Sequence, residues 1–102
     1  MEFDSTEHMF WWIFAGSRGG AMRARIAMSL RDLPQNANQL ASNLGVNYRT
    51  ITHHLRILEE NGIVKSGGPK YGKVYFLTDL FLMNDGLFDE VVGRKVERRG
   101  RP

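Results

Sequence analysis

The hydrophobic period of the sequence changes at Gly62, and this change limits the folds open to the chain. Before Gly62, apolar residues recur at the three- and four-residue spacing of amphipathic helices. We expect such helices at about residues 5–14, 20–32, 36–44 and 47–61. After Gly62, the runs 63–66 and 73–78 are β-prone and flank a Gly-rich turn. A last helix is expected at about residues 79–96.

The ends of these helices carry recognisable signals. Ser5 is expected to cap the first helix, and Asn36 with Gln39 three residues later forms a capping-box pattern. Gly45 closes one short helix, and Asn47 can cap the next. The sequence therefore predicts a mainly α fold with a small β-hairpin. Its plan is a winged helix-turn-helix with additional N- and C-terminal helices that form a dimer interface.

The chain has 102 residues, of which 42% are hydrophobic, and this is enough for one modest core. We divide it into an N-terminal aromatic dimerisation helix at 1–18, a winged helix-turn-helix at 19–78 and a C-terminal dimerisation helix at 79–97. A basic, disordered tail is expected at 98–102. The sequence has no cysteine and no apolar run long enough to span a bilayer, so we expect a cytoplasmic protein.

The central block of the chain is basic. Residues 16–78 hold nine lysines and arginines against three acids, while the net charge of the whole chain is +3. This layout favours a polyanionic partner, although charge alone also fits an ordinary solvated surface. No nucleophile with a supporting base and no paired carboxylates are evident, so we predict that the protein is not an enzyme.

The helix at 47–61 has two different faces. Ile51, Leu55 and Leu58 form its buried stripe. The opposite face is expected to read DNA bases in the major groove through Tyr48, Arg49, Thr52, His53 and Arg56. The alternative is an ordinary solvated helix face. The short helix and the glycine turn before it, and the basic hairpin after it, favour the first interpretation.

The hairpin, whose residues 65–73 are expected to form a wing, is the second element with a predicted role. The side chains expected to meet the DNA backbone are Asn47, Lys65, Lys70, Tyr71 and Lys73. Such contacts supply affinity and position but no sequence information. The Gly67-Gly68-Pro69 apex also fits an ordinary turn. It has no phosphate-cradling nucleotide motif around it.

The two terminal helices are rich in large apolar side chains. We expect them to pack across a two-fold dimer interface, because a domain of this size has little room to bury both. The residues assigned to this interface are Phe10, Trp11, Trp12, Phe14, Phe81, Leu82, Leu87, Phe88 and Val91. An aromatic effector pocket formed by Trp11, Trp12 and Phe14 is the less favoured alternative.

Residues 38–64, which include the run His53-His54-Leu55, together with residues 71–78, resemble the DNA-binding core and wing of ArsR-like winged-helix repressors. The resemblance covers about residues 19–78. The N-terminal aromatic segment and the lack of cysteine look more like small archaeal members of this superfamily. The resemblance implies a homodimer on a roughly palindromic DNA site, with base contacts from Arg49, Thr52, His53 and Arg56.

The sequence departs from the metal-sensing members of that family. They carry a cysteine pair on the helix before the recognition element, whereas this chain has none, and its last predicted helix has no histidine. We therefore expect no metal and no cofactor. His54 lies at the flank of the buried stripe, where a hydrogen-bonded structural role is favoured over metal ligation. Whether a small-molecule effector binds is left open by the sequence.

The function predicted from these features is that of a homodimeric, sequence-specific, double-stranded DNA-binding transcriptional regulator. One alternative is a chromatin-coating protein of low sequence specificity. A less favoured one is a winged helix used for protein–protein contact.

Overall fold

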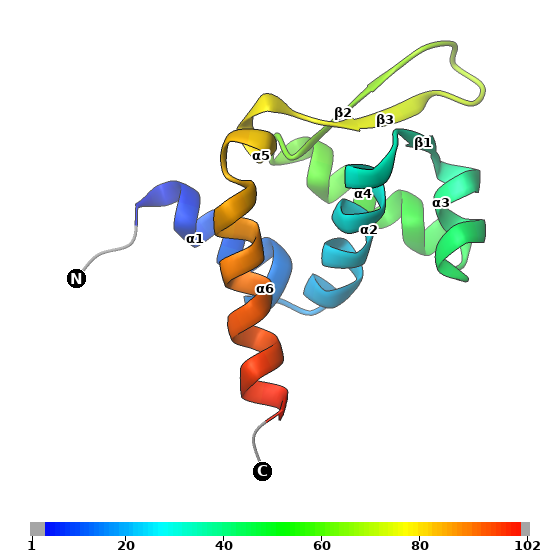
Figure 1. Ribbon diagram of the computed structural model, residues 1–102. Helices are drawn as coiled ribbons and strands as arrows, with labels where there is room; N and C mark the ends of the chain where they lie inside the picture. Colours follow the sequence, from blue (N-terminus) through cyan, green and yellow to red (C-terminus); the bar gives the residue numbers. More distant parts are fainter. Residues whose placement is uncertain (1–3, 101–102) are drawn as a thin grey trace.

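The computed structural model describes the backbone of residues 4–100 and the side chains of residues 4–93 (Figure 1). The N-terminal part contains α1 (Ser5–Trp11), a π-helical turn η1 (Trp12–Gly16) and α2 (Gly20–Asp32). Next come β1 (Gln35–Asn36), α3 (Ala37–Leu44) and α4 (Tyr48–Glu60). The chain continues with β2 (Val64–Gly67), β3 (Val74–Leu77), α5 (Asp79–Met83) and α6 (Asp85–Gly100). This mainly helical architecture with a small antiparallel sheet is that of a winged helix-turn-helix, as predicted.

The caps of α3 and α4 are those expected from the sequence. The Gln39 amide donates to Asn36 Oδ1 and the Asn36 amide donates to Gln39 Oε1, both at 2.8 Å. Gly45 ends α3 with φ at +65°, a conformation that favours glycine. Asn47 Oδ1 then accepts from the Arg49 amide at 2.7 Å. These local contacts fix the turn between the two helices.

The hairpin is part of a three-stranded antiparallel sheet in the order β1-β3-β2. Val64 pairs with Leu77 across the hairpin, and Gln35 pairs with Tyr75 on the other side of β3. The sequence analysis missed β1, because two residues are too short to show a period. Gln35 is held there by contacts of its own, since its side-chain amide donates to the Ser29 carbonyl oxygen at 3.1 Å.

The terminal helices differ from the prediction in three respects. Asp4, and not Ser5, caps α1, because its Oδ1 accepts from the Glu7 amide at 2.8 Å. The predicted single helix at 79–96 is divided at Asn84 into α5 and α6. Helical backbone continues to Gly100, the disorder expected at 98–102 stays a prediction, and residues 101–102 lie outside the described residues. No helix in the described part of the chain is long and apolar enough to cross a membrane.

The aromatic side chains of the terminal helices form the core of a single protomer. Phe14 packs edge-on against Phe88 with ring centroids 4.8 Å apart, and Phe81 contacts Phe88 at 5.1 Å. Five of the nine residues assigned to the dimer interface are at most 2% exposed, namely Phe10, Phe14, Phe81, Phe88 and Val91. The expectation that a domain of this size lacks room for them is therefore wrong, because α1, η1, α5 and α6 bury them together.

The other four residues assigned to that interface remain accessible to different degrees. Trp12 and Leu82 are each 51% exposed, and Trp11 and Leu87 are half-buried. Of the residues assigned to the interface, only these four still have apolar surface that a second copy of the chain could bury. The dimer itself stays a prediction.

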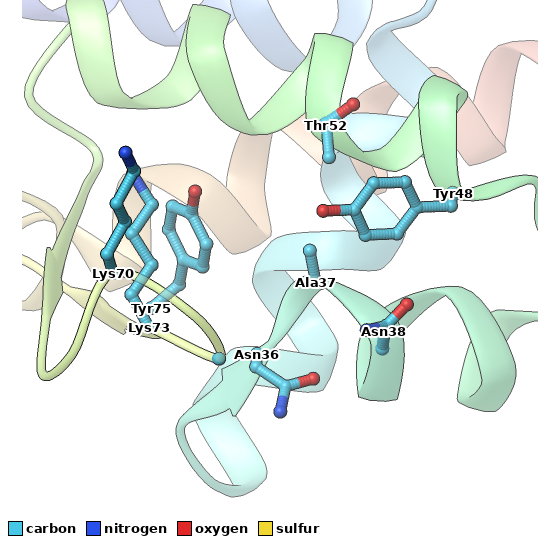
Figure 2. Close-up of a pocket in the computed structure, with 9 residues that line it drawn as sticks. Asn36, Ala37, Asn38, Tyr48, Thr52, Lys70, Lys73 and Tyr75 are labelled. Atoms are coloured by element: carbon cyan, nitrogen blue, oxygen red, sulfur yellow. The ribbon is translucent and has the colours of Figure 1, made fainter.

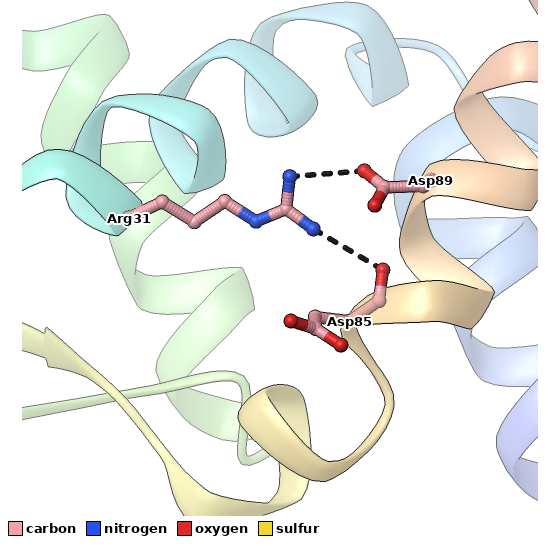
Figure 3. A network of polar contacts seen from close by, with 3 residues as sticks. All are labelled: Arg31, Asp85 and Asp89. Atoms are coloured by element: carbon pink, nitrogen blue, oxygen red, sulfur yellow. Dashed lines mark hydrogen bonds and ion pairs between the residues drawn. The ribbon is translucent and has the colours of Figure 1, made fainter.

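Arg31, on α2, forms hydrogen bonds with two residues of α6 (Figure 3). Its Nη1 donates to Asp89 Oδ1 at 2.9 Å and its Nη2 donates to the Asp85 carbonyl oxygen at 3.1 Å. The guanidinium carbon also lies 4.9 Å from the centroid of the Phe88 ring. Charge, hydrogen bonds and stacking thus act at one point, where α6 begins to cross the helical core.

Candidate nucleic-acid interface

Helix α4 separates a buried face from an exposed one. Ile51, Leu55 and Leu58 are at most 1% exposed, as its apolar spacing predicts. His54 is buried on the flank of this stripe with 7% exposure. Because the inner face is fixed in the core, the opposite face of the helix has a defined orientation toward solvent.

The residues assigned to base reading are on or near that outer face. Arg49, His53 and Arg56 are exposed, and Tyr48 is 50% exposed. Thr52 is half-buried, and its hydroxyl donates to the Arg49 carbonyl oxygen at 3.0 Å. With its proton used inside the helix, the Thr52 oxygen has only acceptor capacity left. The outer face therefore offers guanidinium donors, an imidazole and hydroxyl groups in its N-terminal part.

The residues assigned to the DNA backbone lie on the wing and at the start of α4. Lys65, Lys70 and Lys73 are exposed, and Tyr71 is 87% exposed near the apex of the hairpin. Lys73 Nζ lies 5.5 Å from the centroid of the Tyr75 ring. Asn47 is also exposed, but its side-chain oxygen is occupied by the cap of α4. In Figure 1 the loop of the hairpin projects away from the helical core, above α3.

A small pocket joins the wing to both helices of the helix-turn-helix (Figure 2). It encloses about 100 Å³ and brings together four residues that the sequence analysis had assigned to two separate surfaces. These four are Tyr48, Thr52, Lys70 and Lys73. The pocket is completed by Asn36, Ala37, Asn38, Gly72 and Tyr75. The sequence analysis missed Asn36, Asn38 and Tyr75, because their proximity comes from the β1–β3 pairing.

Behind α4, a buried arginine contacts His54. Arg23 belongs to α2 and is 2% exposed. Its side chain reaches from α2 to the η1 turn and to α4. Its Nε donates to the Ile13 carbonyl oxygen at 2.9 Å, its Nη2 donates to Ser17 Oγ at 2.6 Å, and its Nη1 lies 3.2 Å from His54 Nδ1. The predicted hydrogen-bonded role of His54 is thereby confirmed. Burial lowers the pKa of His54, and the charges of Arg23 and His53 lower this pKa further.

Arg23 was missed by the sequence analysis although a signal for it exists. It precedes Ile26 by three residues and Ala27 by four, so it lies on the apolar stripe of α2. An arginine at such a position must either extend to solvent or find acceptors inside the protein. Here it finds the carbonyl oxygen of Ile13, which is exposed to it at the π-helical turn.

The described residues can be searched for a metal site and for the aromatic effector pocket considered above. Among the side chains at 4–93, no three His, Asp or Glu residues are grouped so that they could hold a metal ion. Of the three aromatic residues considered for an effector pocket, Phe14 is 1% exposed and packs in the core. Trp12 lies over the Arg23 guanidinium, with 5.5 Å between the ring centroid and the guanidinium carbon.

The fold and this surface define the class of winged helix-turn-helix proteins. Residues 22–66 match the family described as "Bacterial regulatory protein, arsR family". The match covers α2, α3, α4 and most of β2, which is the helix-turn-helix and the start of the wing. Among curated proteins, no sequence matches the chain.

Solved structures of bacterial regulators share the fold. An ArsR-like transcriptional regulator from Rhodococcus sp. RHA1 is 25% identical with a TM-score of 0.62, over 91% of this chain and 85% of that one. AbfR of Staphylococcus epidermidis is 21% identical with a TM-score of 0.67, over 87% and 60%. Lactococcus lactis ZitR is 17% identical with a TM-score of 0.58, over 76% and 53%.

The chain thus spans about half the length of ZitR and nearly the whole of the Rhodococcus regulator. Residues 22–66 thus resemble the helix-turn-helix domain of the arsR family of regulatory proteins, and the fold resembles that of an ArsR-like regulator. The proteins that share this domain and this fold are regulatory proteins.

Proposed function

We propose that this chain is a sequence-specific, double-stranded DNA-binding transcriptional regulator that acts in the cytoplasm as a homodimer. Helix α4 enters the major groove and reads base edges through Arg49, His53 and Arg56, with Tyr48 and Thr52 at its N-terminal end. The wing lies along the backbone through Lys65, Lys70, Tyr71 and Lys73, and Asn47 contacts a phosphate at the start of α4.

A single observation carries this proposal. The inner face of α4 is fixed in the core, while Arg49, His53 and Arg56 are exposed on its other side. A helix held in this way presents its donors in a constant geometry, which base recognition in the major groove requires. A structure of ZitR in complex with DNA, which shares the fold with 16% identity and a TM-score of 0.58, supports the assignment of the partner.

The homodimer follows from the symmetry of DNA recognition and from the exposed apolar side chains. Two copies related by a two-fold axis place two α4 helices in successive major grooves, about 34 Å apart. Trp12 and Leu82, each 51% exposed, give such a pair apolar surface to bury. The aromatic core of each protomer is complete without the partner.

Fluorescence anisotropy with two labelled duplexes, across a salt series, tests the function. One duplex carries the DNA upstream of the protein's own gene and the other carries the same bases in scrambled order. We expect the native duplex to bind about 1,000-fold more tightly. Equal, strongly salt-dependent binding to both would instead favour a chromatin-coating protein, and absence of binding to both would favour a protein-contact module.

The reading face is tested by substitution. Arg49→Ala and Arg56→Ala should each weaken binding to the native duplex and reduce its preference over the scrambled one, by about 1–3 kcal/mol for a bidentate base contact. Arg25→Ala is the matched control, because Arg25 is an exposed arginine on α2 whose Nη2 donates to the Leu44 carbonyl oxygen. If both α4 variants kept the full preference, the assigned face would be wrong.

A further inference from the structure

The pocket between the wing, α3 and α4 has the chemistry of an anion site. Its lining offers the ammonium groups of Lys70 and Lys73 and the hydroxyls of Tyr48 and Tyr75. No Asp or Glu is among the described residues that line it. A site with two cations, several hydrogen-bond donors and no acid favours a negatively charged occupant.

The first turn of α3 adds backbone donors to this pocket. Ala37 and Asn38 are the first two residues of the helix and both line the pocket. Amides at these positions have no partner within a helix, and the capping box engages only the amides of Asn36 and Gln39. The positive end of the helix dipole is directed to the same place.

Tyr75 provides an independent sign that the pocket is built for a ligand. The residue is 7% exposed, yet its hydroxyl has no hydrogen-bond partner among the described residues. Figure 2 shows Tyr75 on the same side of the pocket as the Lys70 and Lys73 side chains, with the Tyr48 hydroxyl pointing toward it from α4. Among the described residues no buried side-chain polar atom lacks a partner, so this hydroxyl is accessible from the pocket and can donate to an occupant.

The size of the pocket limits its occupant. The pocket is small, at about 100 Å³, and this suits a single small anion such as one phosphate group. The pocket also lies between the wing and the N-terminal half of α4, the two elements that the proposed function places against DNA. A backbone phosphate can reach it without the bases entering.

We propose that this pocket binds a phosphate-class oxyanion through Tyr75, Tyr48, Lys70, Lys73 and the first amides of α3, and that it holds one DNA phosphodiester in the complex. The second part rests on the proposed function, whereas the first does not. Seating a phosphate here fixes the wing and α3 to the same point of the backbone. It thereby sets the register in which α4 meets the bases.

Titration of the DNA-free, ¹⁵N-labelled protein with inorganic phosphate tests the site itself, with sodium chloride of equal ionic strength as the reference. We expect phosphate to shift the amide signals of Asn38 and Gly72 saturably and chloride not to do so. Tyr75→Phe removes one oxygen and should weaken this binding. Tyr71→Phe is the matched control, because Tyr71 is 87% exposed and does not line the pocket.

The same two variants test whether the phosphate that the pocket holds is one of the DNA backbone. Loss of a hydrogen bond to a charged group is expected to weaken duplex binding by about tenfold in Tyr75→Phe, equally for native and scrambled duplexes. Tyr71→Phe should stay within about twofold of the unsubstituted protein. Thermal unfolding of both variants confirms that the comparison is made between folded proteins.

The outcomes separate the two parts of the proposal. Saturable phosphate shifts with unchanged DNA affinity in Tyr75→Phe would keep the oxyanion site but overturn DNA as its source. Phosphate shifts in a protein that ignores every duplex would overturn the proposed function and keep the pocket. If phosphate acted no differently from chloride and Tyr75→Phe bound DNA like the unsubstituted protein, the site would be refuted.

Discussion

Arg23 Nη1 lies 3.2 Å from His54 Nδ1, and this contact joins α2 to the flank of α4 inside the protein. Every polar hydrogen of a guanidinium is a donor, so Nδ1 of His54 must accept and the ring is neutral with its proton on Nε2. The same arginine donates to the Ile13 carbonyl oxygen at 2.9 Å. One side chain thus links the N-terminal segment to the helix that carries the proposed reading face.

Acid should destabilise the fold through His54. Burial first, and then the charges of Arg23 and His53, lower the pKa of His54 below its ordinary value of 6.5. The unfolded chain therefore binds more protons than the folded one in this range, so the free energy of unfolding rises with pH. This contribution is fully present above about pH 6.5 and is lost as the pH falls through the folded pKa.

Urea unfolding between pH 5 and 8 measures this dependence. His54→Gln keeps an acceptor for Arg23 but cannot be protonated, so it should flatten the profile in this range. His53→Gln is the matched control, because His53 is exposed on the neighbouring position of α4. An unaltered pH profile in His54→Gln would show that His54 is not the group responsible.

Gly19→Ala should destabilise the protein at the same contact. Gly19 has φ at +88°, and a Cβ there would lie 2.7 Å from His54 Cε1 and 3.0 Å from Arg23 Nη1. The left-handed conformation alone costs an L-residue about 1–2 kcal/mol. Gly68→Ala is the control, since Gly68 has φ at +94° and nothing within 4 Å of its Cβ position. Denaturant unfolding should show a clearly larger loss for Gly19→Ala, and equal losses would mean that the His54–Arg23 packing yields easily.

The sequence predicts those helices whose ends are set by residues only a few positions away. Helix α2 ends shortly before Pro34, α3 and α4 begin with side-chain caps, and the Asn36 capping box forms as its spacing indicates. The break between α5 and α6 has a local cause that carries a weaker signal. Asn84 Nδ2 donates to the Leu80 carbonyl oxygen at 2.8 Å, and asparagine side chains often compete for helix carbonyls without ending the helix.

The candidate site was predicted in pieces, because its assembly depends on contacts distant in sequence. Lys70 and Lys73 on the wing, and Tyr48 on α4, were each assigned from their own segment. Their meeting in one pocket requires Gln35 and Asn36 to pair with β3, and a two-residue strand has no detectable period. Tyr75 is buried on β3 between the half-buried Val74 and the exposed Phe76, and nothing in the sequence distinguishes it from a core residue without a role for its hydroxyl.

Phe88→Ala should lower the stability of the protomer strongly. Phe88 is 1% exposed and contacts Phe14, Phe81 and the Arg31 guanidinium. Truncating a buried phenylalanine costs about 3–5 kcal/mol, and this loss should be independent of protein concentration if the ring belongs to the core of one chain. Phe76→Ala is the control, because Phe76 is 37% exposed on β3. A loss that disappeared at high protein concentration would assign Phe88 to a subunit interface instead.

Lys73→Ala should weaken binding to native and scrambled duplexes alike. A lysine that neutralises one phosphate contributes about 0.9 to the slope of log affinity against log salt, and its removal should reduce the slope by that amount. Arg25→Ala is the matched control, because Arg25 carries an exposed charge on α2, and it should leave the slope nearly unchanged. Anisotropy titrations over a salt series give both slopes, and equal slopes for Lys73→Ala and the unsubstituted protein would remove Lys73 from the backbone contacts.

Leu82→Glu should dissociate the proposed homodimer without unfolding the protomer. Leu82 is 51% exposed on α5, so a charge there leaves the core of the chain intact but must be desolvated in an interface that covers it. Sedimentation equilibrium should show monomer for Leu82→Glu at concentrations where the unsubstituted protein is dimeric. Met28→Glu is the matched control, because Met28 is an exposed apolar residue, 42% accessible, on α2 outside the assigned interface. If Leu82→Glu remained dimeric and Met28→Glu did not, the dimer interface would be formed by α2 and not by the C-terminal helices. DNA binding of the monomeric variant should fall much further than that of Met28→Glu, because a single α4 helix reads only one half-site.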